Sequence, residues 1–108
     1  MMYYPDVWVV LRIESEDSPV IYKVLAGTSG GYLDSSSWRI NSGITKVEKE
    51  DDCYLFHGFS GSVYACHQDS YRMNLASSGI YNEIMDRHEA TVTMLPKDTD
   101  FLNIDLSK

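Results

Sequence analysis

Apolar and polar residues alternate at the start of the chain, and this pattern predicts a β-hairpin. The apolar side chains of 7–13 fall mainly on one face of an extended strand, and a second apolar run covers 20–25. The polar, acidic stretch 14–18 and Pro19 separate the two runs. We therefore expect 7–13 and 20–25 to pair as antiparallel strands.

Glycine, serine and asparagine divide the middle of the chain. The stretch 27–37 is rich in glycine and serine and predicts a surface loop, which a short extended segment at 38–40 follows. The sequence Asn41-Ser42-Gly43 is a turn signal, and the strand character that resumes over 44–48 ends at the acidic turn 51–52.

A central hairpin is expected from 53–57 and 62–66, which flank Gly58-Phe59-Ser60-Gly61. A two-residue or a four-residue loop pairs His57 with Ser62 and places Cys53 opposite Cys66. One face of the hairpin then carries Cys53, Leu55, His57, Ser62, Tyr64 and Cys66, and the other carries Tyr54, Phe56, Val63, Ala65 and His67.

Helical spacing replaces alternation after the hairpin. Asp69 or Ser70 can cap a helix whose inward positions run at helical spacing through Met73, Ala76, Ile80, Ile84 and His88. Gly79 favours a break, so the pattern allows one helix or two short ones. Strand character returns over 90–95, and a last alternation at 102–106 predicts a closing strand.

These elements predict an α+β fold. We expect an antiparallel β-meander of five to seven strands, open or curled into a small barrel, with one or two short helices after the central hairpin. The length of 108 residues suits a single domain over 1–108.

Charge narrows the possible partners. Nine Lys and Arg against 16 Asp and Glu leave a net charge of −7, which repels phosphate backbones, so we expect no direct nucleic-acid binding. No run approaches the roughly 20 apolar residues of a membrane span, and the start lacks the features of a secretory signal. The expectation is a cytoplasmic protein without membrane contact.

The two cysteines allow three interpretations. They are core thiols, a cross-strand disulfide, or two zinc ligands with His57 as a third. The spacing of the two cysteines lacks a C-x2-C knuckle, so we predict neither a bound metal nor a cofactor.

Catalytic motifs are incomplete in this chain. Cys53 and His57 would lie roughly 13 Å apart along a strand, too far for nucleophilic chemistry. The glycines at 27–31 are not followed by the lysine of a phosphate loop, and 58–62 does not match a nucleophile elbow. We expect a protein that is not an enzyme.

Binding residues are sought among aromatic and arginine side chains in or beside loops. Rigid aromatic rings lose little entropy on docking, and arginine holds anions. The candidates for ligand or partner binding are Trp38, Arg39, Phe59, Tyr71 and Arg72.

Two segments, 38–44 and 61–67, resemble small uncharacterised proteins of phages and prophages, and the similarity extends over about residues 7–72. The resemblance implies no activity and no site residue. It implies an accessory protein that binds a host protein or a small signalling molecule.

Together, these points favour a non-enzymatic, acidic binding protein that binds a host protein and counters a defence or regulatory system. The alternative is a protein that binds or sequesters a small anionic ligand, such as a nucleotide signal, in an aromatic and arginine pocket. Aromatic patches and open sheet edges make a homo-oligomer compatible with either function.

Overall fold

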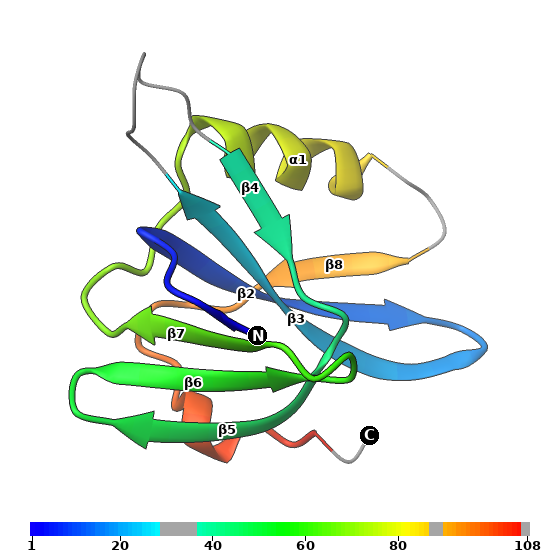
Figure 1. Cartoon of the computed structure of the whole chain (residues 1–108). Helices are drawn as coiled ribbons and strands as arrows, with labels where there is room; N and C mark the ends of the chain where they lie inside the picture. Colours follow the sequence, from blue (N-terminus) through cyan, green and yellow to red (C-terminus); the bar gives the residue numbers. More distant parts are fainter. Residues whose placement is uncertain (29–36, 87–89, 107–108) are drawn as a thin grey trace.

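Eight strands and two helical segments make up residues 1–28, 37–86 and 90–106, the part of the chain described by a computed structural model (Figure 1). The strands are β1 (Met2–Tyr3), β2 (Val7–Ser15), β3 (Ser18–Thr28), β4 (Ser37–Ile40), β5 (Ile44–Glu50), β6 (Cys53–Gly58), β7 (Val63–His67) and β8 (Thr91–Met94). The helices are α1 (Leu75–Met85) and the 3-10 helix η2 (Phe101–Asn103). Most of the loop expected at 27–37 lies outside the described residues.

The strands form two four-stranded sheets. Sheet A has the order β1-β7-β6-β5 and sheet B the order β4-β3-β2-β8. All neighbours pair antiparallel except β1 and β7, which are parallel. The predicted α+β fold with antiparallel strands is confirmed. The expected strand number was too low, and the described residues form two separate sheets and no closed barrel.

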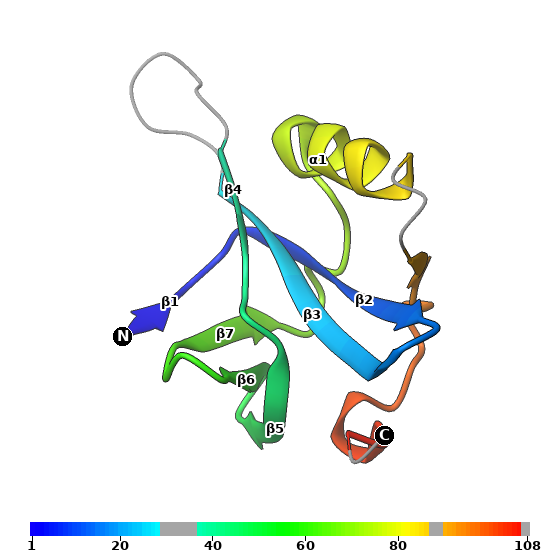
Figure 2. The ribbon, with the colours of Figure 1, turned by 90° about the vertical axis from the view of Figure 1, so that its right-hand side faces the viewer.

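Sheet B is apolar on both faces because it lies in the middle of the molecule. Trp8 and Val10 of β2 point toward sheet A, whereas Val9 and Leu11 point toward α1. Figure 2 shows α1 on one side of β2 and β3 and sheet A on the other. The alternation expected at 7–13 is therefore a two-sided core strand, in which both sets of side chains are covered.

An aromatic cluster fills the space between the sheets. The Trp8 ring has its centroid 5.3 Å from that of Phe56 and 5.2 Å from that of Phe101, which comes from η2. Phe101 is only 2% exposed. The closing strand predicted at 102–106 is wrong for this reason, since the chain turns as a 3-10 helix to insert Phe101 into the core.

The chain crosses from sheet B to sheet A at Asn41. Its backbone N–H donates to the Val24 carbonyl (3.1 Å), and its side-chain Oδ1 accepts from the Val24 N–H (2.9 Å). The Asn41 side chain thus replaces a backbone carbonyl at the end of β4 and lets the backbone turn away. Gly43 follows at φ 133°, a conformation that L side chains rarely adopt.

The central hairpin exists, but its predicted register is wrong. His57 pairs with Val63 and Tyr54 with Cys66, so Cys53 lies opposite His67. The loop contains three residues, 59–61, and Gly61 takes φ 89° after a turn closed by its N–H and the Gly58 carbonyl (3.1 Å). An odd loop length changes which side chains share a face. Tyr54, Phe56, Tyr64 and Cys66 therefore belong to one buried cluster.

Helix α1 begins later than expected, at Asn74 rather than at Asp69 or Ser70. The Asn74 side chain accepts from the Ser77 N–H (2.8 Å), and the Ser77 hydroxyl accepts from the Asn74 N–H (2.9 Å), a complete capping box. Residues 70–71 cannot join the helix because they pair with β2, where the Trp8 N–H donates to the Ser70 carbonyl (3.2 Å). Gly79 lies within the helix and does not break it.

Candidate functional site

A pocket of about 240 Å³ lies between an edge strand of sheet A and an edge strand of sheet B. The edges are β1 and β4, which lie near each other on one side of the molecule in Figure 2. We call it the Arg39 pocket. Its lining residues are Tyr3, Tyr4, Pro5, Ala26, Thr28, Ser37, Trp38, Arg39 and Tyr64.

Arg39 supplies the positive charge of the pocket. Its pairing with Ala26 places it on the face of sheet B that is turned toward sheet A. The guanidinium lies 4.2 Å from the centroid of the Tyr3 ring, a cation–π contact. Within the described residues Arg39 forms no ion pair, in contrast to Arg12, which pairs with Glu14.

Tyr3 and Tyr64 form the aromatic wall. The parallel pairing of β1 with β7 puts the two residues opposite each other, and their ring centroids are 5.0 Å apart. Tyr64 as a whole residue is 2% exposed; its hydroxyl has no hydrogen-bond partner within the described part of the chain, and its oxygen is not one of the fully buried atoms. Burial raises the pKa of Tyr64, and the nearby Arg39 charge opposes that rise. The hydroxyl therefore remains a neutral donor.

Two exposed aromatic side chains are part of the pocket lining. Tyr4 is 73% exposed and Trp38 is 45% exposed. Trp38 pairs with Gly27, so its Cβ lies on the opposite face of sheet B from Arg39. The structure thus brings Trp38 and Arg39 to one strand at the pocket, as neighbours that point to different sides.

The other predicted binding residues lie elsewhere. Phe59 is at the tip of the β6–β7 hairpin and 72% exposed, and its ring lies against Gly43, where an added Cβ would come within 2.8 Å of it. The Phe59 N–H donates to the Gly43 carbonyl (3.2 Å). This contact fastens the hairpin tip to the turn where the chain changes sheets.

Tyr71 has a structural place in the core. Its hydroxyl donates to the Leu95 carbonyl (2.5 Å) and accepts from the Val10 N–H (3.1 Å). Burial raises the pKa of Tyr71 to about 12. The hydroxyl thereby joins the strand β2 to the segment after β8, while its neighbour Arg72 is exposed.

The two cysteines face different environments because of the observed register. Both are free thiols; Cys66 is buried between the sheets, and Cys53 is partly exposed on the other face of sheet A. Burial, with a smaller effect of Cys53, raises the pKa of Cys66. Among the described residues no three His, Cys, Asp or Glu side chains converge as a metal site.

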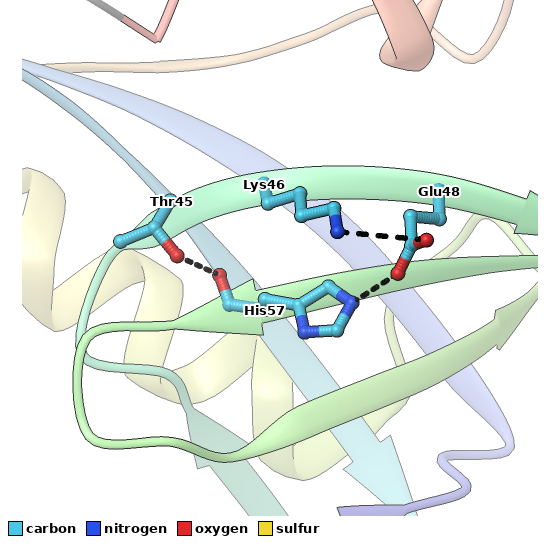
Figure 3. A network of polar contacts seen from close by, with 4 residues as sticks. All are labelled: Thr45, Lys46, Glu48 and His57. Atoms are coloured by element: carbon cyan, nitrogen blue, oxygen red, sulfur yellow. Dashed lines mark hydrogen bonds and ion pairs between the residues drawn. The ribbon is translucent and has the colours of Figure 1, made fainter.

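A polar network on sheet A joins His57 to Glu48 (Figure 3). The distance from His57 Nε2 to Glu48 Oε1 is 2.6 Å, and Lys46 Nζ lies 3.7 Å from the other carboxylate oxygen. The hydrogen bond from His57, followed by the Lys46 charge, lowers the pKa of Glu48. The pair lies on the strand surface and lines neither the Arg39 pocket nor the larger hollow described next.

A broader hollow of about 770 Å³ adjoins the β2–β3 turn. Glu14, Glu16 and Asp17 line it, together with serines and the start of β8. Its size exceeds that of the Arg39 pocket, but among the described residues its lining carries carboxylates and no Lys or Arg. The Arg39 pocket, which combines an arginine with aromatic side chains, is therefore the better candidate for a recognition site.

Sequence reasoning found Arg39 and Trp38 but missed Tyr3, Tyr4 and Tyr64. The alternation of Tyr64 with Cys66 on one strand face was a signal for Tyr64. Nothing in the local pattern places the first strand beside residue 64, because that pairing joins distant parts of the chain.

No family model, no curated protein and no solved structure matches this chain. Within the described residues, no helix has the length and apolar character needed to cross a membrane.

Proposed function

We propose that this chain is a non-enzymatic binding protein that docks on a partner protein through the Arg39 pocket and the exposed side chains around it. The observation that carries the proposal is the pocket itself: its arginine has no ion-pair partner within the described residues, and the side chains of Tyr64, Tyr4 and Trp38 line the pocket with it. Tyrosine, tryptophan and arginine are residue types enriched at protein interfaces.

Pocket size favours a partner protein over a free nucleotide. Sites for small organic ligands usually enclose roughly 300–1,000 Å³, whereas the Arg39 pocket encloses about 240 Å³. That volume suits one protruding side chain of a partner, with the surrounding apolar residues covering the contact. The same proposal includes a host protein as the partner and a role against a host defence or regulatory system, on the basis of the resemblance to phage proteins.

Site-specific photo-crosslinking in native cells tests this function. A benzophenone amino acid at Tyr4 lies beside the pocket, and one at Leu102 is the control, because Leu102 is 46% exposed on η2, away from β1 (Figure 2). We expect a discrete crosslinked protein from position 4, absent from position 102 and lost when Arg39→Ala is combined with it. The same products from both positions, or products that survive Arg39→Ala, would contradict the proposal.

A further inference from the structure

We infer that the Arg39 pocket is a carboxylate site, and that the side chain it takes from the partner is an Asp or a Glu. This inference rests on the proposed function, because it names the chemistry of the same docking site. Arg39 and the Tyr64 hydroxyl would hold the carboxylate oxygens, and the Tyr3 ring would cover the methylene groups of the incoming side chain.

Arg39 is prepared for a planar anion. A guanidinium has five N–H donors in a rigid fork that matches the two oxygens of a carboxylate. The contact with Tyr3 at 4.2 Å restrains the guanidinium plane without using its donors. Within the described residues, no carboxylate uses those donors.

Tyr64 supplies a second donor to the pocket. The residue lines the pocket, and its hydroxyl has no acceptor within the described residues. That oxygen is not among the fully buried atoms without a partner, so it keeps accessible surface on which a ligand can be bound. An acceptor oxygen of a carboxylate would pair with this donor.

The rest of the lining agrees with an anion of single charge. No Asp or Glu of the described residues lines this pocket, where the other polar side chains are hydroxyls of Tyr3, Tyr4, Thr28 and Ser37. One guanidinium balances one carboxylate. A phosphate, which carries about −1.5 to −2 charges near pH 7, would leave uncompensated negative charge in a protein that already has a net charge of −7.

Titration with small probes, followed by two-dimensional NMR at constant ionic strength, tests the inference. The probes are sodium propionate, its neutral analogue propionamide and inorganic phosphate. Propionate is expected to shift the Tyr3, Arg39 and Tyr64 signals saturably by about 100 mM, the concentration that corresponds to about −1.4 kcal/mol. Arg39→Gln and Tyr64→Phe should each weaken propionate binding by at least about tenfold.

Arg72→Gln is the matched control, because Arg72 is exposed and lies outside the pocket lining. It should leave propionate binding unchanged. The inference is overturned if propionate gives no saturable shift, if propionamide binds equally well, if phosphate binds more than about tenfold tighter, or if Arg39→Gln binds propionate as the parent chain does.

The outcomes separate this inference from the proposed function. Loss of propionate binding with intact crosslinking at position 4 would reject the carboxylate but keep the partner protein. Propionate binding without any crosslinked protein would keep the carboxylate site and reject the docking function.

Discussion

Asn41 shows how much one side chain contributes to this fold. Its Oδ1 accepts the Val24 N–H that a continuing strand would otherwise bind through a backbone carbonyl. The residue is 3% exposed, so water cannot take over when the amide is removed. The crossing between the two sheets therefore depends on an acceptor at this position.

We predict that Asn41→Leu lowers the free energy of unfolding by about 1–3 kcal/mol, because the Val24 N–H is left buried without an acceptor. Urea denaturation followed by tryptophan fluorescence measures the change. Asn82→Ala, which removes an exposed amide from α1, is the control and should change stability by less than about 0.7 kcal/mol. Equal effects of the two substitutions would contradict this role of Asn41.

The predicted binding residues also show what the sequence could and could not predict about the candidate site. Arg39 was found because an arginine close to aromatic residues in or beside loops is a chemical signal. Tyr71 carries a similar signal, but its hydroxyl is bound to Leu95 and Val10 inside the molecule. Residue type alone cannot separate these two situations, since they differ in tertiary hydrogen bonding.

At the scale of elements, α1 has a well-capped N-terminus and, at Gly79, a residue of low helix propensity in its interior. The capping box of Asn74 and Ser77 fixes its first turn, whereas Gly79 adds flexibility in the middle. A Cβ on Gly79 would have no atom within 4 Å. The glycine is thus free of any packing requirement in the described structure.

Gly79→Ala is expected to raise the free energy of unfolding by about 0.5–1 kcal/mol, because alanine restricts the unfolded chain and favours the helix. Gly27→Ala provides a contrast with the same chemical change. There the new Cβ would come within 2.7 Å of the Asn74 side chain, so the cap must shift and stability should fall. Thermal denaturation of both variants checks the opposite signs, and a stabilised Gly27→Ala would refute the packing argument.

Elements were easier to predict than the way they pair. Alternation and turn signals predict the β2–β3 hairpin and the strands at β4, β5 and β8, because strand periodicity is local. The loop of the central hairpin was compatible with several lengths. Only a positive φ at Gly61 selects three residues, and the exchange of faces follows from that single choice.

At the scale of the whole molecule, the packing between the two sheets depends on the side chain of Phe101. Phe101 joins rings from both sheets, with centroids 5.2 Å from Trp8, 5.4 Å from Tyr54 and 5.3 Å from Tyr71. It therefore packs the aromatic side chains of β2, β6 and the segment after β7 against η2. No sequence signal distinguished it from the alternating residues that follow it.

We predict that Phe101→Ala costs about 3–5 kcal/mol, a large part of the 5–15 kcal/mol by which domains are usually stable. Leu102→Ala, next to it but 46% exposed, should stay within about 0.5 kcal/mol of the parent chain. Calorimetry or urea unfolding distinguishes the two. Similar losses at both positions would place Phe101 outside the core that the structure describes.

The Arg39 pocket exists only while β1 is paired with β7, because Tyr3 of β1 forms part of its lining. Only two residue pairs, Met2↔Val63 and Tyr3↔Tyr64, join β1 to sheet A. A strand with so few pairs at the edge of a sheet can separate through a local opening that leaves both sheets intact. A ligand held between Arg39 and Tyr64 would oppose that opening, so occupancy and the order of the first strand are thermodynamically linked.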